Sequence, residues 1–289
     1  MEFELSSDLA RPHQSWEDAV LWLRAQPDMQ ALVREAYYDD PLIDTCNRYH
    51  DSREWAGVQS ELKGRAGVAL DVGAGFGIAS YALARDGFSV IALEPDPSDL
   101  VGSGAIRTLA KDHGLPITVK EGVSESLPLP DASIDVVFAR AVLHHTSNLS
   151  AALREFARVL KPGGLFVAIR EHVITRPEDL PRFLAAHPLH RLYGGENAFL
   201  VTTYVSAITD SGLKLEKIIK PLEHVINYAP HDRDALNAEI ADRLGHRLGL
   251  SRPITAMLDL PIIGDMLIRA AGYFDHRPGR HYSFVANKV

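Results

Sequence analysis

The sequence predicts an α/β protein whose mostly parallel sheet is covered by helices on both faces. Three observations support this fold class. Short apolar runs alternate with helical patterns, glycines follow the predicted helices, and a glycine-rich turn follows the first predicted strand. Strands that alternate with helices need right-handed crossover connections, and such connections build a parallel sheet.

Seven segments have the composition of strands. The first five are short, apolar and rich in β-branched residues, which is typical of strands buried on both faces. They cover residues 68–72, 89–94, 117–121, 134–139 and 165–169. Two later segments, near 213–220 and at 281–288, complete a sheet of seven strands.

Helical patterns connect these strands. Predicted helices at 78–86 and 97–113 each end before a glycine, which favours the left-handed conformation that commonly ends a helix. A third helix near 150–160 places Leu153, Phe156 and Leu160 on one face before "KPGG" ends it.

The chain divides into three predicted parts. Residues 1–64 form an N-terminal helical cap, in which a longer helical segment from 41 ends at Gly64. Residues 65–221 and 281–289 form the α/β core, and residues 222–280 form a helical insertion before the last strand. The insertion is open to four interpretations: a lid, a homodimer surface, a membrane-surface contact, or simple packing on the core.

Composition restricts the partners. The 289 residues carry a net charge of −8 with no basic block, so we expect no nucleic acid. A single cysteine excludes an internal disulfide, and the N-terminus lacks a basic start followed by an apolar run, so we expect a cytoplasmic protein. The most apolar stretch, 254–274, contains Asp259, Asp265 and Arg269, so we expect no transmembrane segment.

The stretch "LDVGAGFG" is the first candidate binding site. Its glycines are Gly73, Gly75 and Gly77. They allow a sharp turn and close approach to a ligand, although a glycine-rich packing turn is the alternative. A dinucleotide fingerprint would place the third glycine at 78, which is Ile78. Asp71 suits a cationic ligand, and Glu94 closes the second strand where a carboxylate can accept both ribose hydroxyls. These residues favour a nucleoside without phosphates.

Four segments in order resemble the motifs of the class I S-adenosylmethionine-dependent methyltransferases. They are "LDVGAGFG", "VIALEPDP", "EGVSESLPLPDASIDVVFARAVLHH" and "EFARVLKPGG". The resemblance covers about residues 66–170 and is closest to the small-molecule branch that includes ubiquinone and menaquinone methyltransferases. It implies a Rossmann-like fold, S-adenosylmethionine as cofactor and a small-molecule methyl acceptor.

The resemblance also implies which residues contact the cofactor. Asp71 and the loop of Gly73, Gly75 and Gly77 would hold the methionine end, and Glu94 would hold the ribose hydroxyls. The remaining implied contacts are Pro95 and Asp96 at the ribose–adenine edge, Gly122, Val123 and Ser124 at the adenine, Arg140 and Ala141 near the sulfonium, and Tyr49 in the cap. Many relatives carry Asp where this chain has Val123, so the adenine contact departs from the family pattern.

Histidines are the candidate bases. Methyl transfer from a sulfonium is an in-line displacement, and a base is needed only when the acceptor must lose a proton. Histidine has a suitable pKa. His144 and His145 follow the fourth predicted strand, and Glu171 and His172 follow the fifth. The alternative is that these histidines pack or hydrogen-bond the loops.

A polar segment after the fifth strand is the candidate acceptor site. "HPLHRLYGGENAF" supplies His187, His190, Tyr193, Glu196 and Asn197, which join Glu171 as predicted acceptor contacts. Such groups suit an acceptor with hydroxyls, for example a sugar or a glycolipid-like compound. The alternative is a surface turn that caps the next helix. We expect no metal site.

Two other functions stay open. The chain would then be a non-catalytic cofactor-binding subunit, or an oxidoreductase that uses a nicotinamide nucleotide. The intact acidic and glycine positions argue against the first, and the glycine spacing argues against the second.

Overall fold

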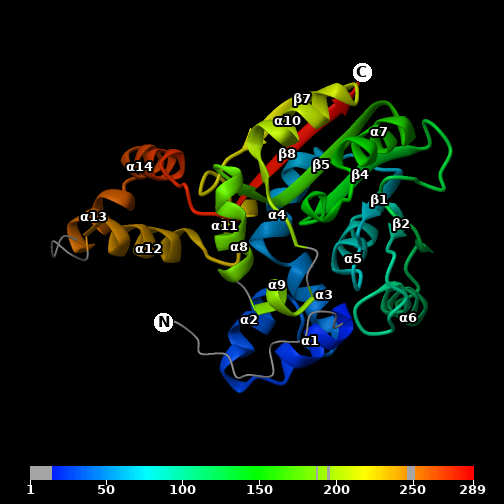
Figure 1. The fold of residues 1–289 in the computed structure, drawn as a ribbon, viewed down its shortest axis with the longest axis horizontal. Coiled ribbons are helices and arrows are strands. Elements are labelled where there is room, and N and C mark those ends of the chain that lie inside the picture. The colour runs from blue at the N-terminus through cyan, green and yellow to red at the C-terminus, as the bar shows by residue number, and fades with distance from the viewer. Residues whose placement is uncertain (1–14, 187, 194–195, 246–250) are drawn as a thin grey trace.

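The computed structural model describes residues 15–186, 188–193, 196–245 and 251–289. Its sheet has the order β3-β2-β1-β4-β5-β8-β7, with a short extra strand, β6, beside β5 (Figure 1). The strands are β1 (Val68–Val72), β2 (Ser89–Leu93), β3 (Ile117–Lys120), β4 (Ile134–Arg140), β5 (Leu160–Ile174), β6 (Phe199–Leu200), β7 (Leu213–Ile219) and β8 (Arg280–Lys288). The first five pair in parallel, and β8 is antiparallel to β5 and β7. The predicted Rossmann-like sheet is confirmed, with β6 as an unpredicted addition.

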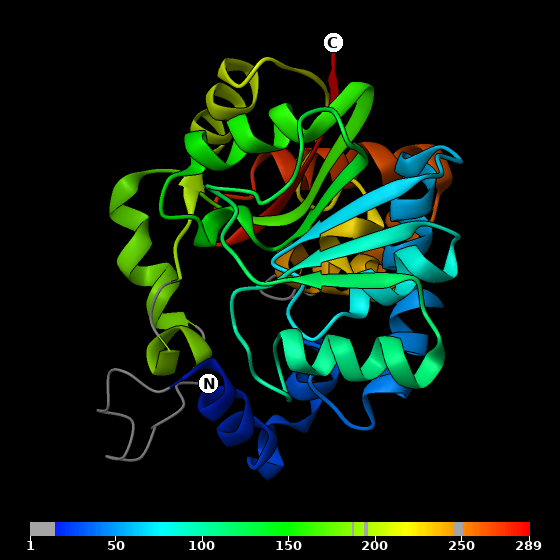
Figure 2. The same ribbon diagram turned by 90° about the vertical axis from the view of Figure 1, so that its right-hand side faces the viewer.

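Helices cover both faces of this sheet (Figure 2). On one face, α7 (Leu149–Val159) and α10 (Val201–Asp210) bury Phe156 and Tyr204 against β4, β5 and β8. On the other, α3 (Leu42–His50), α4 (Arg53–Leu62) and α5 (Ile78–Arg85) bury a second cluster that includes Trp55. Successive strand residues alternate between the two clusters, so the strands are apolar on both sides.

Strand β5 is longer than predicted. It runs from Leu160 through the "KPGG" segment to Ile174, because β8 pairs with it over most of its length. The pairing is irregular between Ala168 and Glu171, and Arg170 between them has φ +58°. Glu171 and His172 therefore lie inside β5, and the prediction that they follow the strand was wrong.

Helix α6 is shorter than predicted. It spans Ser103–His113, whereas the sequence predicted a start at residue 97. The intervening segment folds into a turn in which the Ser98 hydroxyl accepts from the backbone N–H groups of Leu100 and Val101, at 2.9 and 3.0 Å. These local bonds compete with helix formation, which is typical of serine.

The N-terminal helices are α1 (Trp16–Arg24), a 3-10 turn η2 (Pro27–Met29), α2 (Gln30–Glu35), α3 and α4. The long helix predicted over 41–64 is wrong, because the chain breaks after His50 and Ser52 caps α4 through the N–H of Trp55. Helix α1 lies near α9 (Pro188–Tyr193) (Figure 1), and the Trp16 ring packs on Tyr193 with ring centroids 5.2 Å apart. The N-terminal helices and the segment after β5 therefore support each other.

Residues between β7 and β8 form α11 (Val225–Tyr228), α12 (Arg233–Gly245), α13 (Ser251–Leu258) and α14 (Pro261–Tyr273). The last three extend to one side of the sheet (Figure 1) and bury Leu236, Ile240 and Ile268 in a small core of their own. Within the described residues, no helix has both the length and the apolar character to cross a bilayer. The division of the chain at residues 64, 221 and 280 stays a prediction.

Candidate functional site

The glycine turn links β1 to α5. Gly73, Gly75 and Gly77 have φ values of +59°, +55° and +95°, in the left-handed region that side chains disfavour. A Cβ on Gly75 would meet nothing within 4 Å, so that side of the turn faces open space. A Cβ on Gly73 would instead lie 2.8 Å from the Val142 side chain. The turn is therefore packed against the end of β4 and open at Gly75.

Glu94 joins the ends of β1 and β2. Its Oε2 accepts from the Gly75 N–H at 2.7 Å, and its Oε1 accepts from the Asp96 N–H at 2.9 Å. Burial raises the pKa of Glu94 to about 7. A carboxylate has about four acceptor positions, so Glu94 can accept from the N–H groups of Gly75 and Asp96 and still accept hydrogen bonds from a ligand.

Asp71 is a second buried carboxyl group beside this turn. Its Oδ2 accepts from the Ser80 hydroxyl at 2.6 Å, and burial raises its pKa to about 7, with a further rise from the charge of Glu94. Two neighbouring acids whose ionised forms are disfavoured would be stabilised by a cationic ligand.

The predicted adenine segment has few polar side chains that face outward. Asp96 is used locally, since its Oδ1 accepts from the Ser98 N–H at 2.9 Å, and Pro95 beside it is exposed. Val123 is 53% exposed and has no polar group, while the Ser124 hydroxyl lies 3.0 Å from Glu125 Oε2. A Cβ on Gly122 would meet the Leu93 side chain at 3.4 Å.

Arg140 lies in a buried ion-pair cluster. Its Nε lies 2.7 Å from Glu54 Oε1, and Arg170 Nη1 lies 3.5 Å from the other Glu54 oxygen. Burial alone would raise the pKa of Glu54, but the two arginines hold it below its ordinary value. The Arg140 guanidinium also lies over the rings of Tyr37 and Tyr49, at 5.5 and 5.2 Å.

This cluster fixes the backbone after β4. Tyr49, predicted to contact the cofactor, is fully buried beneath Arg140, and its ring packs against Trp55 at 5.5 Å. Ala141 follows with φ +56° and donates its N–H to the Ile169 carbonyl at 2.8 Å. The described contacts thus give Arg140 and Tyr49 a role in shaping the end of β4.

Glu171 holds the loop that carries His144. Its Oε1 accepts from the N–H groups of Val142 and Leu143, both at 3.1 Å, and its Oε2 accepts from the His144 N–H at 3.2 Å. The same Oε2 lies 2.7 Å from His144 Nδ1. Burial raises the pKa of Glu171 to about 7, and the backbone N–H groups limit the rise. Because these three donors favour the carboxylate, His144 Nδ1 is the donor in the fourth bond.

Four histidines gather around Glu196. His144 Nε2 lies 3.6 Å from Glu196 Oε2, His145 Nε2 lies 3.6 Å from Oε1, and His190 Nε2 lies 3.8 Å from Oε2. The His172 ring is 4.5 Å from that of His144, centroid to centroid. Burial lowers the pKa of His144 and of His172 well below the ordinary value. The structure thus brings the predicted bases and three predicted acceptor contacts, counting Glu171, into one cluster.

The other predicted acceptor contacts lie apart from this cluster or are used locally. Tyr193 is 42% exposed and packs on Trp16. Asn197 Oδ1 accepts from the Ala198 N–H at 2.8 Å. His187 and the Gly194–Gly195 turn lie outside the described residues.

Two residues at this site were missed by sequence reasoning. Glu54, on α4, which covers one face of the sheet, neutralises Arg140 at the end of β4. His281, on β8, pairs with His172 on β5, and their ring centroids are 5.1 Å apart. Only the antiparallel register of β5 and β8 brings these two histidines together, and the sequence does not reveal that register.

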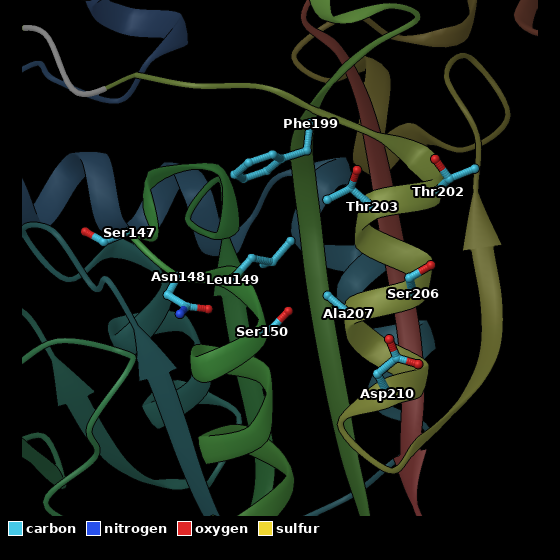
Figure 3. A pocket seen from close by; sticks show the side chains of 10 residues that line it. All are labelled: Ser147, Asn148, Leu149, Ser150, Phe199, Thr202, Thr203, Ser206, Ala207 and Asp210. Atoms are coloured by element: carbon cyan, nitrogen blue, oxygen red, sulfur yellow. The ribbon is translucent and has the colours of Figure 1, made fainter.

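A surface hollow of about 550 Å³ lies between α7 and α10 (Figure 3). Small and polar side chains dominate its lining: Ser147, Asn148, Leu149, Ser150, Phe199, Thr202, Thr203, Ser206, Ala207 and Asp210. None of the predicted site residues lines it, so the hollow is separate from the cluster around Glu196.

The glycine turn and the acidic end of β2 occur in a segment that matches a known family. Residues 70–168 match the family described as "Methyltransferase domain". The chain contains a class I methyltransferase domain. This domain includes the glycine turn, Glu94, Arg140 and the two histidines after β4.

Curated relatives of the methyltransferase domain act on different acceptors. The chain is 37% identical over 105 residues to dimethylglycine N-methyltransferase of Parasynechococcus marenigrum, covering 36% of this chain and 37% of that protein. It is 29% identical over 141 residues to a ubiquinone biosynthesis O-methyltransferase of Paramagnetospirillum magneticum, covering 48% and 55%. The chain thus spans between about a third and a little over half of these relatives' lengths.

A solved structure shows the same fold over more of the chain. A geranyl diphosphate methyltransferase in complex with SAM superposes with a TM-score of 0.56 at 13% identity, over 88% of this chain and 94% of that one. This likeness extends beyond the methyltransferase domain to some of the flanking helices, and at this identity it concerns the fold alone.

Proposed function

We propose that the chain binds S-adenosylmethionine at the glycine turn and transfers its methyl group to a hydroxyl of a small molecule, such as a sugar or a glycolipid-like compound. One observation supports this function best. Val142 packs its side chain against Gly73, while its N–H is bound by Glu171 in the histidine cluster. A candidate cofactor turn and a cluster of candidate bases therefore share one wall.

The acidic groups suit the cofactor. S-adenosylmethionine carries a sulfonium cation and a ribose, and Glu94 and Asp71 offer buried carboxyl groups beside an open glycine turn. In this proposal Glu94 accepts from the ribose hydroxyls, and Asp71 lies toward the methionine end.

The acceptor site lies at the histidine cluster. His145 is the base in this proposal, because its side chain is 37% exposed and can reach an acceptor that enters from outside. His144 is buried, His172 is partly buried and both are neutral, so they position the acceptor. Proximity and a desolvated site supply the rest of the acceleration, since the sulfonium is already activated.

Titration calorimetry with S-adenosylmethionine, its demethylated product and NAD tests the cofactor assignment. We expect the first two to bind and NAD not to bind. Binding of NAD alone would refute the assignment. A screen of hydroxyl, amine and thiol compounds with methyl-labelled cofactor then tests the acceptor class. Transfer to amines only would overturn the hydroxyl assignment, and tight cofactor binding without transfer to any compound would favour a non-catalytic subunit.

A further inference from the structure

Three potential ligand atoms converge beside the end of β4. His144, His172 and Glu196 each offer one such atom, and these atoms all lie within 4.8 Å of one another. They come from the turn after β4, from β5 and from the segment that follows α9. Residues that are 28 and 24 positions apart in the chain are thus held close together, with His144 buried and the other two partly buried.

Both histidines are oriented through their Nδ1 atoms. His144 Nδ1 lies 2.7 Å from the Glu171 carboxylate, and His172 Nδ1 lies 3.0 Å from the Gly279 carbonyl oxygen. A carbonyl or a carboxylate accepts, so each Nδ1 carries the hydrogen and each neutral ring keeps a lone pair on Nε2. Metal-binding histidines are held in this way by a second hydrogen bond in most proteins.

Glu196 lacks a matching donor. Its side chain is only 7% exposed, and Oε2 accepts no hydrogen bond from any residue in the described part of the chain. The histidine nitrogens lie 3.6 to 3.8 Å from it, beyond hydrogen-bonding distance. A cation at this position would satisfy the carboxylate.

We propose that His144, His172 and Glu196 bind one divalent transition-metal ion, such as zinc, through two imidazole nitrogens and one carboxylate oxygen. Two neutral imidazoles and a carboxylate suit zinc, iron, cobalt or nickel better than magnesium or calcium, which prefer oxygen ligands. Three protein ligands leave a coordination position open, as in catalytic zinc sites.

The geometry needs only a small closure. Zinc binds nitrogen and oxygen at about 2.0–2.2 Å, so ligand atoms around a tetrahedral ion are about 3.3 Å apart. His144 Nε2 and Glu196 Oε2 are already 3.6 Å apart. The remaining separations are at most 4.8 Å, so side-chain rotations of Glu196 and of the two imidazoles would have to close them by up to about 1.5 Å.

The role of the ion rests on the proposed function. Its open position would hold the acceptor hydroxyl and lower the pKa of that group. The acceptor O–H would give its proton to His145, and the oxygen would form the new bond to the methyl carbon. The carbon–sulfur bond breaks at the same time, and its electron pair stays on sulfur.

Metal binding is tested first without activity. The full chain, freed of metal by a chelator and without an affinity tag, is titrated with Zn²⁺ by calorimetry and with Co²⁺ by visible absorption. We expect one ion per chain and cobalt bands typical of a four- or five-coordinate site. Absence of stoichiometric binding of both ions would overturn the proposal.

Variants then locate the ion. Glu196→Gln keeps the shape of the side chain and removes its charge, and His172→Gln removes one imidazole. We expect each to weaken Zn²⁺ binding by at least tenfold, whereas His113→Ala, on the exposed end of α6, leaves it unchanged. Circular dichroism of the metal-free variants checks the fold. If His172→Gln unfolds, Glu196→Gln decides. Unchanged affinity in a folded Glu196→Gln protein would refute the site.

A failure of the proposed metal site can be distinguished from a failure of the proposed methyl transfer. Cofactor binding is measured on the metal-free and the metal-loaded protein. Cofactor binding without metal binding overturns only the metal site, whereas metal binding without cofactor binding overturns only the proposed methyl transfer.

Discussion

Replacing Glu94 by Gln tests the cofactor site most directly, because the pKa of this side chain is raised to about 7. At this pKa about one-tenth of the groups are ionised at pH 6 and about nine-tenths at pH 8. Only the carboxylate can accept from both ribose hydroxyls while it holds the N–H groups of Gly75 and Asp96. Affinity of the parent protein for S-adenosylmethionine should therefore rise by up to about tenfold between pH 6 and pH 8.

The variant should lose most of that rise. At pH 8, loss of a charged acceptor costs about 1.5–3 kcal/mol, so the Kd should increase by about ten- to a hundredfold. Some pH dependence remains, because the pKa of Asp71 is also raised to about 7. Calorimetry at pH 6, 7 and 8 measures both effects.

The matched control is Glu121→Gln, at the exposed end of β3. Its carboxylate pairs with Arg107 and makes no contact with the glycine turn. The control should bind the cofactor like the parent protein at each pH. Equal Kd values and equal pH dependence in the parent and Glu94→Gln would refute the ribose contact.

Four further predictions concern the same region. Without ligand, the raised pKa of Glu94 stabilises the folded protein below about pH 4.5, and this stabilisation is lost as the pH rises through about 7. The Glu94→Gln variant lacks this pH dependence, so its Tm relative to that of the parent, measured by thermal melting, should increase from pH 5 to pH 8. Gly75→Val should abolish cofactor binding and cost about 1–2 kcal/mol of stability from its φ of +55°; calorimetry and thermal melting check this, and normal binding would make the turn purely structural. His145→Ala should lower kcat by about a hundredfold while the cofactor Kd stays constant; turnover within a few fold of the parent would exclude it as the base. Glu171→Gln should lower the Tm and kcat together, because three backbone N–H groups and His144 lose a charged acceptor; an unchanged Tm would contradict its positioning role.

Local signals in the sequence predicted most of the sheet. The predicted bounds of β1 agree with the observed strand at both ends, and those of β2 and β3 differ by one residue. Short apolar runs bounded by turn residues are well suited to buried strands, so their ends are visible in the sequence. Helix starts were less predictable. The start of α6 depends on Ser98 and on the Gly102 backbone, and the break between α3 and α4 depends on the Ser52 cap. These are single hydrogen bonds that a hydrophobic pattern does not encode.

The site was predicted by residue type but not by arrangement. The density of histidine and acid after β4 and after β5 indicated chemistry there, and the structure places His144, His145, His172, His190 and Glu196 together. The Arg140–Glu54 pair could not be predicted, because Glu54 lies 86 residues earlier on a helix whose start was also missed. Contacts of this kind depend on tertiary packing.

The irregularity in β5 explains how Glu171 comes to face the His144 loop. Side chains alternate along a strand, and Phe166 and Ala168 pack into the cluster with α7, while Val167 and Ile169 pack on the other face. Val173 would follow Val167 and Ile169 in a regular strand, yet it lies in the cluster with α7. An extra residue in β5, opposite Ser283 of β8, reverses the alternation.

Glu171 shares the alternation of Val173, so the reversal turns it toward the α7 side, where Leu143 is buried. In a regular strand the carboxylate would point to the face that holds Glu54, and no acceptor would hold the N–H groups of residues 142–144. Arg170 takes that direction instead and lies 3.5 Å from Glu54. The bulge thus places the carboxylates of Glu54 and Glu171 on opposite faces of the sheet. Glu54 pairs with Arg170, and Glu171 binds the N–H groups of residues 142–144, which form the loop against which the glycine turn packs.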